Sequence, residues 1–268
     1  MKESNISRHK VSDRTIRRFL NSEGYYFRQA RKKGLLSRLD KTKRVQFCRM
    51  IKKKYTNSLW RGGIAFYLDG TSLAHKCNPS EQAKAPRARI WRKANEGLKR
   101  GCTAKASKTG TGARVVKVMV AISYHKGVII CEDYEKMCGN YFSDFISRNF
   151  EFMFKKTDKK SRMWLWSDPS QNSAKSRRAM KVAKSELLLI PPRSPDLNPI
   201  ENIFHKVRAK LDEEALNNNI TKENFDQFKT RLFRTINSVP IEYIDNVIES
   251  MNKRIDIIIE NKGDRLKY

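Results

Sequence analysis

Two acidic residues stand in settings where a carboxylate could hold a metal ion or move a proton. The first, Asp69, follows an apolar run at residues 64–68 whose β-branched and aromatic content predicts a buried strand. In α/β proteins, ligands gather at the carboxyl ends of such strands. We expect the strand to end in a turn at Asp69 and Gly70, which leaves open whether Asp69 serves a ligand or only the turn.

The second acid, Glu201, lies in the first turn of a helix predicted over residues 199–211. Asn198 is a favourable N-cap residue, and Pro199 suits the first helical position. Glu201 could therefore be a capping-box acid that bonds back to the cap amide. Because the apolar residues of this helix fall on the opposite side, Glu201 could equally project toward the end of the sheet.

The elements that must position these acids alternate between strands and helices. Two predicted strands meet at His125 and Lys126, which indicates a hairpin. In chain order we expect strands at residues 64–69, 114–124 and 127–132, a helix at 141–154, a strand at 162–167, a helix at 174–184, a strand at 186–190 and the helix at 199–211. This order predicts an α/β fold with a mixed sheet and helices on its faces.

Charge and composition point to a polyanionic partner. The 268 residues carry a formal net charge of +29, and the isoelectric point is about 10.1. No apolar run approaches the roughly 18 residues of a membrane span, so we expect no membrane partner. Five widely spaced cysteines without a C-x-x-C pair argue against a zinc finger or a disulfide framework. Charge alone does not distinguish DNA from RNA.

The charge is concentrated in two stretches. Residues 1–60 contain 18 Lys and Arg against four acids, and residues 84–114 contain ten against Glu96 alone. We expect the second stretch, which has several glycines and no apolar period, to be an extended basic arm. In the first stretch, Ser12 can cap a helix that Gly24 ends, with one apolar face. Such a helix suits a helix-turn-helix unit, although an ordinary surface helix would look similar. A further helix is predicted over residues 40–54.

Several segments of the sequence resemble the mariner superfamily of cut-and-paste DNA transposases. Residues 194–201 (SPDLNPIE) are similar to the segment around the family's third catalytic acid, and residues 66–69 (FYLD) to the strand with the first. Residues 11–20 and 30–33 resemble the second of the family's two helix-turn-helix units, and residues 89–92 with 110–124 resemble its loop and second strand. The resemblance implies an RNase H-like domain and double-stranded DNA as partner. It favours DNA contacts by Arg14, Thr15, Arg17, Arg18, Arg31, Lys32, Lys33, Arg89 and Arg92.

The resemblance also implies a mechanism. In this family three carboxylates hold two divalent ions, normally Mg²⁺ with Mn²⁺ as a substitute, for DNA cleavage and strand transfer. The resemblance assigns Asp69 to the first position of this triad and Glu201 to the third. The family usually places 34 residues between its second and third acids, which puts Trp166 at the second position. The nearest acid, Asp168, lies two strand residues further on, a shift of about 6.6 Å.

Asp168 can complete the triad only if the chain bends back beyond the strand. We expect its carboxylate to lie outside the reach of an ion shared with Asp69 and Glu201, although the sequence keeps both outcomes open. One is an active transposase that uses Asp69, Asp168 and Glu201 as catalytic and metal-binding residues. The other is a catalytically inactive, transposase-derived DNA-binding protein.

The domain organisation follows from the same patterns. We expect a helix-turn-helix segment at residues 1–56, an RNase H-like domain at 57–218 with the basic arm at 84–114, and C-terminal helices at 219–268 packed on that domain. The sequence shows only the second helix-turn-helix unit. Basic runs such as Lys52 to Lys54 are compatible with nuclear import, so we expect a nuclear protein. Whether the chain forms a homodimer stays open.

Overall fold

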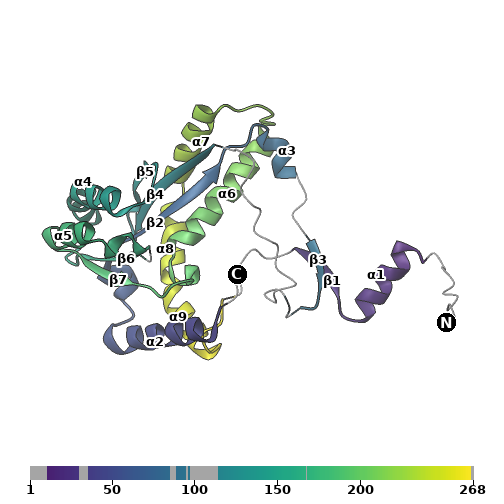
Figure 1. Cartoon of the computed structure of the whole chain (residues 1–268), viewed down its shortest axis with the longest axis horizontal. Coiled ribbons are helices and arrows are strands. Elements are labelled where there is room, and N and C mark those ends of the chain that lie inside the picture. Colours follow the sequence, from purple (N-terminus) through teal and green to yellow (C-terminus); the bar gives the residue numbers. More distant parts are fainter. Residues whose placement is uncertain are drawn as a thin grey trace, which may run out of the picture. The chain divides into compact units, whose positions relative to one another are not determined.

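A five-stranded mixed sheet forms the centre of the larger of two structural units (Figure 1). The computed structural model describes residues 11–29, 36–84, 89–94, 96, 114–166 and 168–266. The strands lie in the order β5-β4-β2-β6-β7, with antiparallel pairing from β5 to β2 and parallel pairing from β2 to β7. Their bounds are β2 Ile64–Ala74, β4 Val115–Ser123, β5 Gly127–Asp133, β6 Met163–Trp166 and β7 Glu186–Leu189. The predicted mixed sheet, including the hairpin between β4 and β5, is confirmed.

Strand β2 continues past the point where we expected it to end. The prediction of a turn at Asp69 and Gly70 is wrong, because β4 pairs with β2 along its whole second half, from Asp69 opposite Val120 to Ala74. The parallel neighbour β6 ends earlier, since its last pair with β2 joins Leu165 to Tyr67. Asp69 therefore lies inside a strand but just beyond the end of β6.

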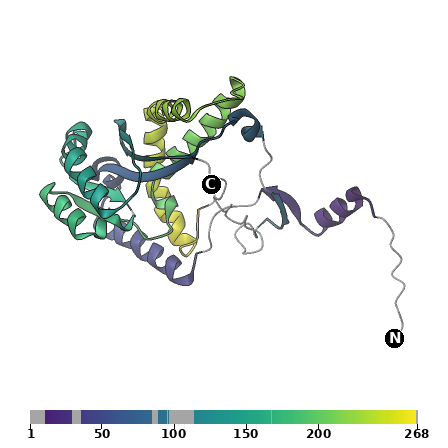
Figure 2. The same cartoon turned by 45° about the horizontal axis from the view of Figure 1, so that its top comes forward.

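Helices cover both faces of the sheet (Figure 2). The side chains between the sheet and these helices form two apolar clusters. One face packs against α4, whose Phe142 and Phe150 meet Phe66, Trp164 and Trp166 of the sheet. The other face packs against α2 and α6 to α9. The helices of this unit are α2 Arg38–Lys54, α3 Pro79–Lys84, α4 Gly139–Thr157, α5 Ala174–Val182, α6 Ile200–Asn217, α7 Phe225–Asn237, α8 Ile241–Glu249 and α9 Met251–Glu260. Within the described residues, no helix has the length and apolar character needed to span a membrane.

Helix α2 belongs to the larger unit, although the sequence grouped it with the N-terminal segment at residues 1–56. The reason is its apolar face, since Phe47, Cys48 and Ile51 are buried in the same cluster as α9. On this face the Arg44 side chain is fully buried and donates two hydrogen bonds of 2.6 Å to the carboxylate of Asp196. Asp196 lies in the loop that precedes α6, so α2 and the C-terminal tail hold that loop in place.

We predict that Arg44→Met lowers the free energy of unfolding by about 3–5 kcal/mol, because it removes the buried guanidinium that donates to both oxygens of the Asp196 carboxylate. Urea denaturation measures the loss. The matched control is Lys52→Met on the same helix, which removes an exposed ion pair to Asp256 and should cost less than about 1 kcal/mol. Equal losses in the two variants would contradict this account of the buried pair.

The smaller unit contains helix α1 (Asp13–Ser22) and a two-stranded antiparallel sheet of β1 (Tyr26–Gln29) and β3 (Arg89–Arg92). Ser12 caps α1 and Gly24 follows its end with a positive φ of 78°, as predicted. The basic arm expected at residues 84–114 is not wholly extended loop. Residues 89–92 form a strand because β1 pairs with it, and Trp91 contacts Phe27 at 5.5 Å between ring centroids.

Candidate active site

The carboxylate of Asp69 is held by three hydrogen-bond donors. The backbone N–H of Gly70 donates to Oδ1 at 2.8 Å, and the indole Nε1 of Trp166 approaches the same oxygen at 3.4 Å. The side-chain amide of Asn198 donates to Oδ2 at 2.9 Å. Both oxygens of Asp69 are thus engaged by groups of the protein itself.

Burial sets the ionisation of Asp69. It raises the pKa of this carboxyl to about 7, and the negative charge of Glu201 adds to the effect. The hydrogen bonds from Gly70 and Trp166 act in the opposite direction, and the charge of Asp168 raises the pKa further. The two acids singled out by the sequence, Asp69 and Glu201, are therefore close enough to interact. At neutral pH, Asp69 is partly protonated.

We predict that Asp69 makes the protein less stable as the pH rises. Its folded pKa of about 7 lies above the ordinary value of 3.8, so its contribution is fully present below about pH 4 and is lost as the pH rises toward 7. Between pH 5 and pH 8 about two pKa units of this contribution are lost, which amounts to roughly 3 kcal/mol at about 1.4 kcal/mol per unit. Urea denaturation of the wild type and Asp69→Asn at pH 5 and pH 8 measures it. Parallel changes in the two proteins would show that Asp69 is not the titrating group.

Trp166 fills the position where the spacing places the second acid. It is the last residue of β6, its side chain is 1% exposed, and its ring lies 4.2 Å from that of Phe142. Asp168 follows outside the strand and accepts hydrogen bonds from the backbone N–H and the hydroxyl of Ser170, at 2.8 and 2.6 Å. It thereby caps the short 3-10 helix η3 (Pro169–Asn172).

The three candidate acids do not form a metal centre in this structure. Asp69 and Glu201 come together, but Asp168 is turned toward Ser170. Across the part of the chain that the structure describes, no group of three or more His, Cys, Asp or Glu side chains could hold a metal ion. With an indole against Asp69 in place of a carboxylate, the residues present do not fit a pair of divalent ions.

Asn198 has a different role from the one predicted. Pro199 rather than Asn198 is the N-cap residue of α6, and it makes no side-chain capping bond. The Asn198 amide instead crosses to Asp69, and its carbonyl oxygen accepts a long bond of 3.4 Å from the backbone N–H of Ile200. The sequence marks Asn198 only as a polar residue at the start of a helix. It does not indicate that the partner of this side chain is Asp69.

Tyr134 is a further residue at this site that the sequence did not reveal. Its hydroxyl lies over Gly70, where an added Cβ would come within 2.8 Å of the phenolic oxygen. Burial and the charges of Asp168 and Asp69 raise the pKa of Tyr134. Its ring also stacks on that of Tyr141, with centroids 5.3 Å apart. A side chain at position 70 would therefore have to displace the Tyr134 hydroxyl, and no turn is formed at Gly70.

The predicted DNA contacts divide into three groups. Arg14, Thr15, Arg17 and Arg18 all lie exposed on α1, of which no residue is buried. Arg31, Lys32 and Lys33 lie outside the described residues. In β3, Arg89 is exposed and lies over the ring of Phe27, whereas the Arg92 side chain is only 5% exposed. In this conformation Arg92 does not offer its guanidinium to a ligand, because it is enclosed.

Comparison with known families gives two matches along the chain. A family described as DDE superfamily endonuclease matches residues 80–222, and a transposase helix-turn-helix family matches residues 2–53. The Tcb1 transposase of Caenorhabditis briggsae is 25% identical over 96% of this chain and 88% of its own length. The Tc1 transposase of Caenorhabditis elegans is 24% identical with the same coverage of both chains. These matches confirm the resemblance seen in the sequence.

Solved structures with the same fold include the Mos1 transposase. A Mos1 paired-end complex with the left transposon end matches 96% of this chain and 72% of its own, with a TM-score of 0.67 and 17% identity. The catalytic domain of the Mos1 mariner transposase matches 88% of this chain and 99% of its own, with a TM-score of 0.59 and 15% identity. The predicted fold class, a mixed sheet flanked by helices, is confirmed.

Proposed function

Because the chain belongs to the DDE superfamily of endonucleases and carries a transposase helix-turn-helix match, we propose that it binds double-stranded DNA but does not cleave it unaided. The net charge of +29 supports the binding, since a strongly basic protein is attracted to the phosphate backbone. Among the solved relatives of this fold, Mos1 forms a complex with a transposon end.

The observation that carries the second half of the proposal is the contact between Trp166 and Asp69. Mos1 transposase structures contain Mg²⁺ or Mn²⁺, and metal-dependent phosphoryl transfer needs carboxylate oxygens that are free to bind the ions. Here both oxygens of Asp69 are bonded to protein donors, and the indole occupies the neighbouring space. We therefore infer that this chain uses its basic surfaces without the two-ion reaction.

One observation supports an active enzyme as the second candidate. The charge of Asp168 contributes to the raised pKa of Asp69, so the two carboxyls are not remote. Rotation of Asp168 away from Ser170 would bring an acid nearer to the site, with Mg²⁺ or Mn²⁺ then held by Asp69, Asp168 and Glu201. Such a movement must also displace the Trp166 side chain, which is packed against Phe142.

Fluorescence anisotropy with a labelled duplex DNA tests the binding proposal. We expect submicromolar affinity at low salt that falls steeply as salt is added, because the contacts are made to phosphates. A duplex RNA of the same sequence should bind more weakly at the same salt concentration, because a helix-turn-helix unit fits the major groove of B-form DNA. Equal or tighter binding of RNA would favour an RNA-binding protein instead.

The same proposal places the protein in the nucleus. Its support is the exposed basic run Lys52 to Lys54 at the end of α2, together with the DNA partner. Microscopy of a fluorescent fusion tests this placement, and exclusion from the nucleus would oppose it.

A further inference from the structure

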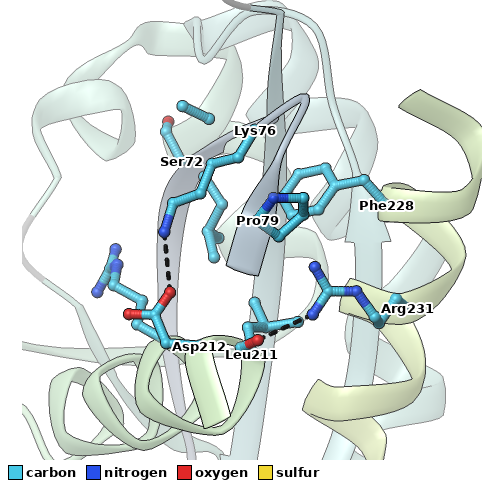
Figure 3. A pocket seen from close by; sticks show the side chains of 10 residues that line it. Ser72, Lys76, Pro79, Leu211, Asp212, Phe228 and Arg231 are labelled. Atoms are coloured by element: carbon cyan, nitrogen blue, oxygen red, sulfur yellow. Dashed lines mark hydrogen bonds and ion pairs between the residues drawn. The ribbon is translucent and has the colours of Figure 1, made fainter. Parts of the chain in front are cut away.

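A cavity of about 200 Å³ lies beside the distal half of β2, between that strand, α6 and α7 (Figure 3). Three cationic side chains, Lys76, Arg208 and Arg231, reach its lining. One acid, Asp212, and the apolar Leu73, Pro79 and Phe228 also line it. Since one water molecule takes up about 30 Å³ in the liquid, the cavity has room for a group of roughly seven waters. It therefore combines positive charge with an apolar wall.

Two of these cations are neutralised by carboxylates. Lys76 donates to Asp212 at 2.8 Å, and Figure 3 shows it reaching across the cavity to that residue. Arg231 is buried and donates to the two carboxylate oxygens of Glu223 at 2.6 and 2.9 Å, and to the backbone oxygen of Leu211. These two pairs build the frame of the cavity.

Arg208 differs from the other two because its hydrogen bond goes to a neutral group, the hydroxyl of Thr71, at 2.6 Å. Partial desolvation lowers the pKa of Arg208, and the negative charge of Glu201 acts in the opposite direction, so the arginine stays charged. A guanidinium has five N–H donors in a planar fork that suits phosphate oxygens. Arg208 therefore brings a positive charge with spare donors to the cavity.

The position of Arg208 relates the cavity to the candidate active site. Thr71 lies two residues after Asp69, on the same face of β2 and about 7 Å along the strand. On α6, Arg208 lies seven residues after Glu201, which is two turns along the same face and about 10 Å away. These distances span two or three phosphates of a DNA strand, whose charges repeat every ~3.4 Å along the helix axis.

We propose that Arg208 and this cavity bind a phosphodiester group of the DNA strand that passes over Asp69 and Glu201. The guanidinium would bind the phosphate oxygens, and the apolar wall of Pro79 and Phe228 would contact the adjoining sugar. The proposal rests on the proposed DNA binding and adds a contact site on the larger unit, separate from the arginines of α1.

Anisotropy titrations of the full chain with duplex DNA at several salt concentrations test this site. Arg208→Gln is expected to weaken binding about 5- to 10-fold and to lower the slope of log K against log salt by about one, as for one lost phosphate contact. Arg208→Lys keeps the charge and should stay within about threefold of the wild type. The matched control is Lys206→Gln, an exposed lysine on the same helix that faces Tyr243 and should change affinity less than twofold. Circular dichroism verifies that each variant is folded.

The outcomes separate this site from the proposed function. If the wild type does not bind duplex DNA, both the proposed function and the proposed cavity site are overturned. If the wild type binds and Arg208→Gln binds equally well with the same salt slope, only the cavity site is overturned. A final experiment titrates inorganic phosphate at constant ionic strength and measures whether it binds and whether it competes with DNA. Arg208-dependent phosphate binding that does not compete with DNA would show a site for free phosphate and would also overturn the proposal.

Discussion

Replacement of Trp166 by aspartate is expected to give a protein that takes up Mn²⁺. The Trp166 side chain already points at Asp69, with its indole nitrogen 3.4 Å from Oδ1. An aspartate in that position is shorter, so its carboxylate would stop short of Asp69 and leave room for an ion between the two acids. We expect Mn²⁺ to bind Trp166→Asp at least about tenfold more tightly than the wild type, or ~1.4 kcal/mol. Electron paramagnetic resonance of free Mn²⁺ measures this difference.

The matched control for that experiment is Trp166→Asn, which has the same shape as the aspartate but no charge. Both variants lose the packing of the indole against Phe142, so both should be destabilised by about 3–5 kcal/mol. Only Trp166→Asp should gain the metal. Equal Mn²⁺ binding by the asparagine variant would mean that space, rather than a ligand, is what the wild type lacks. No gain in either folded variant would place the defect elsewhere in the site.

Neutralisation of the three exposed arginines of α1 is expected to reduce DNA affinity by roughly 100-fold at low salt. The variant is Arg14→Gln with Arg17→Gln and Arg18→Gln. If each arginine contacts one phosphate, the slope of log K against log salt should fall by about three, close to one per contact. Anisotropy with a labelled duplex measures both quantities. The Ser12 cap is untouched, so the helix itself is preserved.

A triple lysine variant at the same positions separates charge from geometry. Because lysine retains the charge, we expect it to keep most of the affinity for DNA of arbitrary sequence. A preference for one sequence that is lost in the lysine variant would indicate that the arginines read base edges. A glutamine variant that binds as well as the wild type would show that α1 is an ordinary surface helix.

The sequence located the two acids because their signals are local. Asp69 comes directly after the buried apolar residues 64–68 of β2, and Glu201 lies in the first turn of a helix with a clear apolar face. Spacing alone also showed that Trp166 stands where the second acid is expected. The extension of β2 was not, because an Asp-Gly pair favours a turn and only the pairing with β4 overrides that preference.

Contacts between distant segments explain the other failures. Asn198 lies 129 residues from Asp69 in the chain, so its capping preference was the stronger local signal. The buried position of Arg44 could not be predicted from its helix alone, because its partner Asp196 is 152 residues away. Tyr134 approaches Gly70 only because β5 and the segment after it fold back along β4.

Nicking of supercoiled plasmid DNA by the wild-type chain, with Mg²⁺ or Mn²⁺, tests most directly whether the Asp69 site can perform metal-dependent cleavage. We predict that the protein binds the plasmid and leaves it uncut. Trp166 and Asn198 donate to the two oxygens of the Asp69 carboxylate, which would otherwise bind the metal ions. Nicking that requires the metal and disappears in Asp69→Ala would contradict this account.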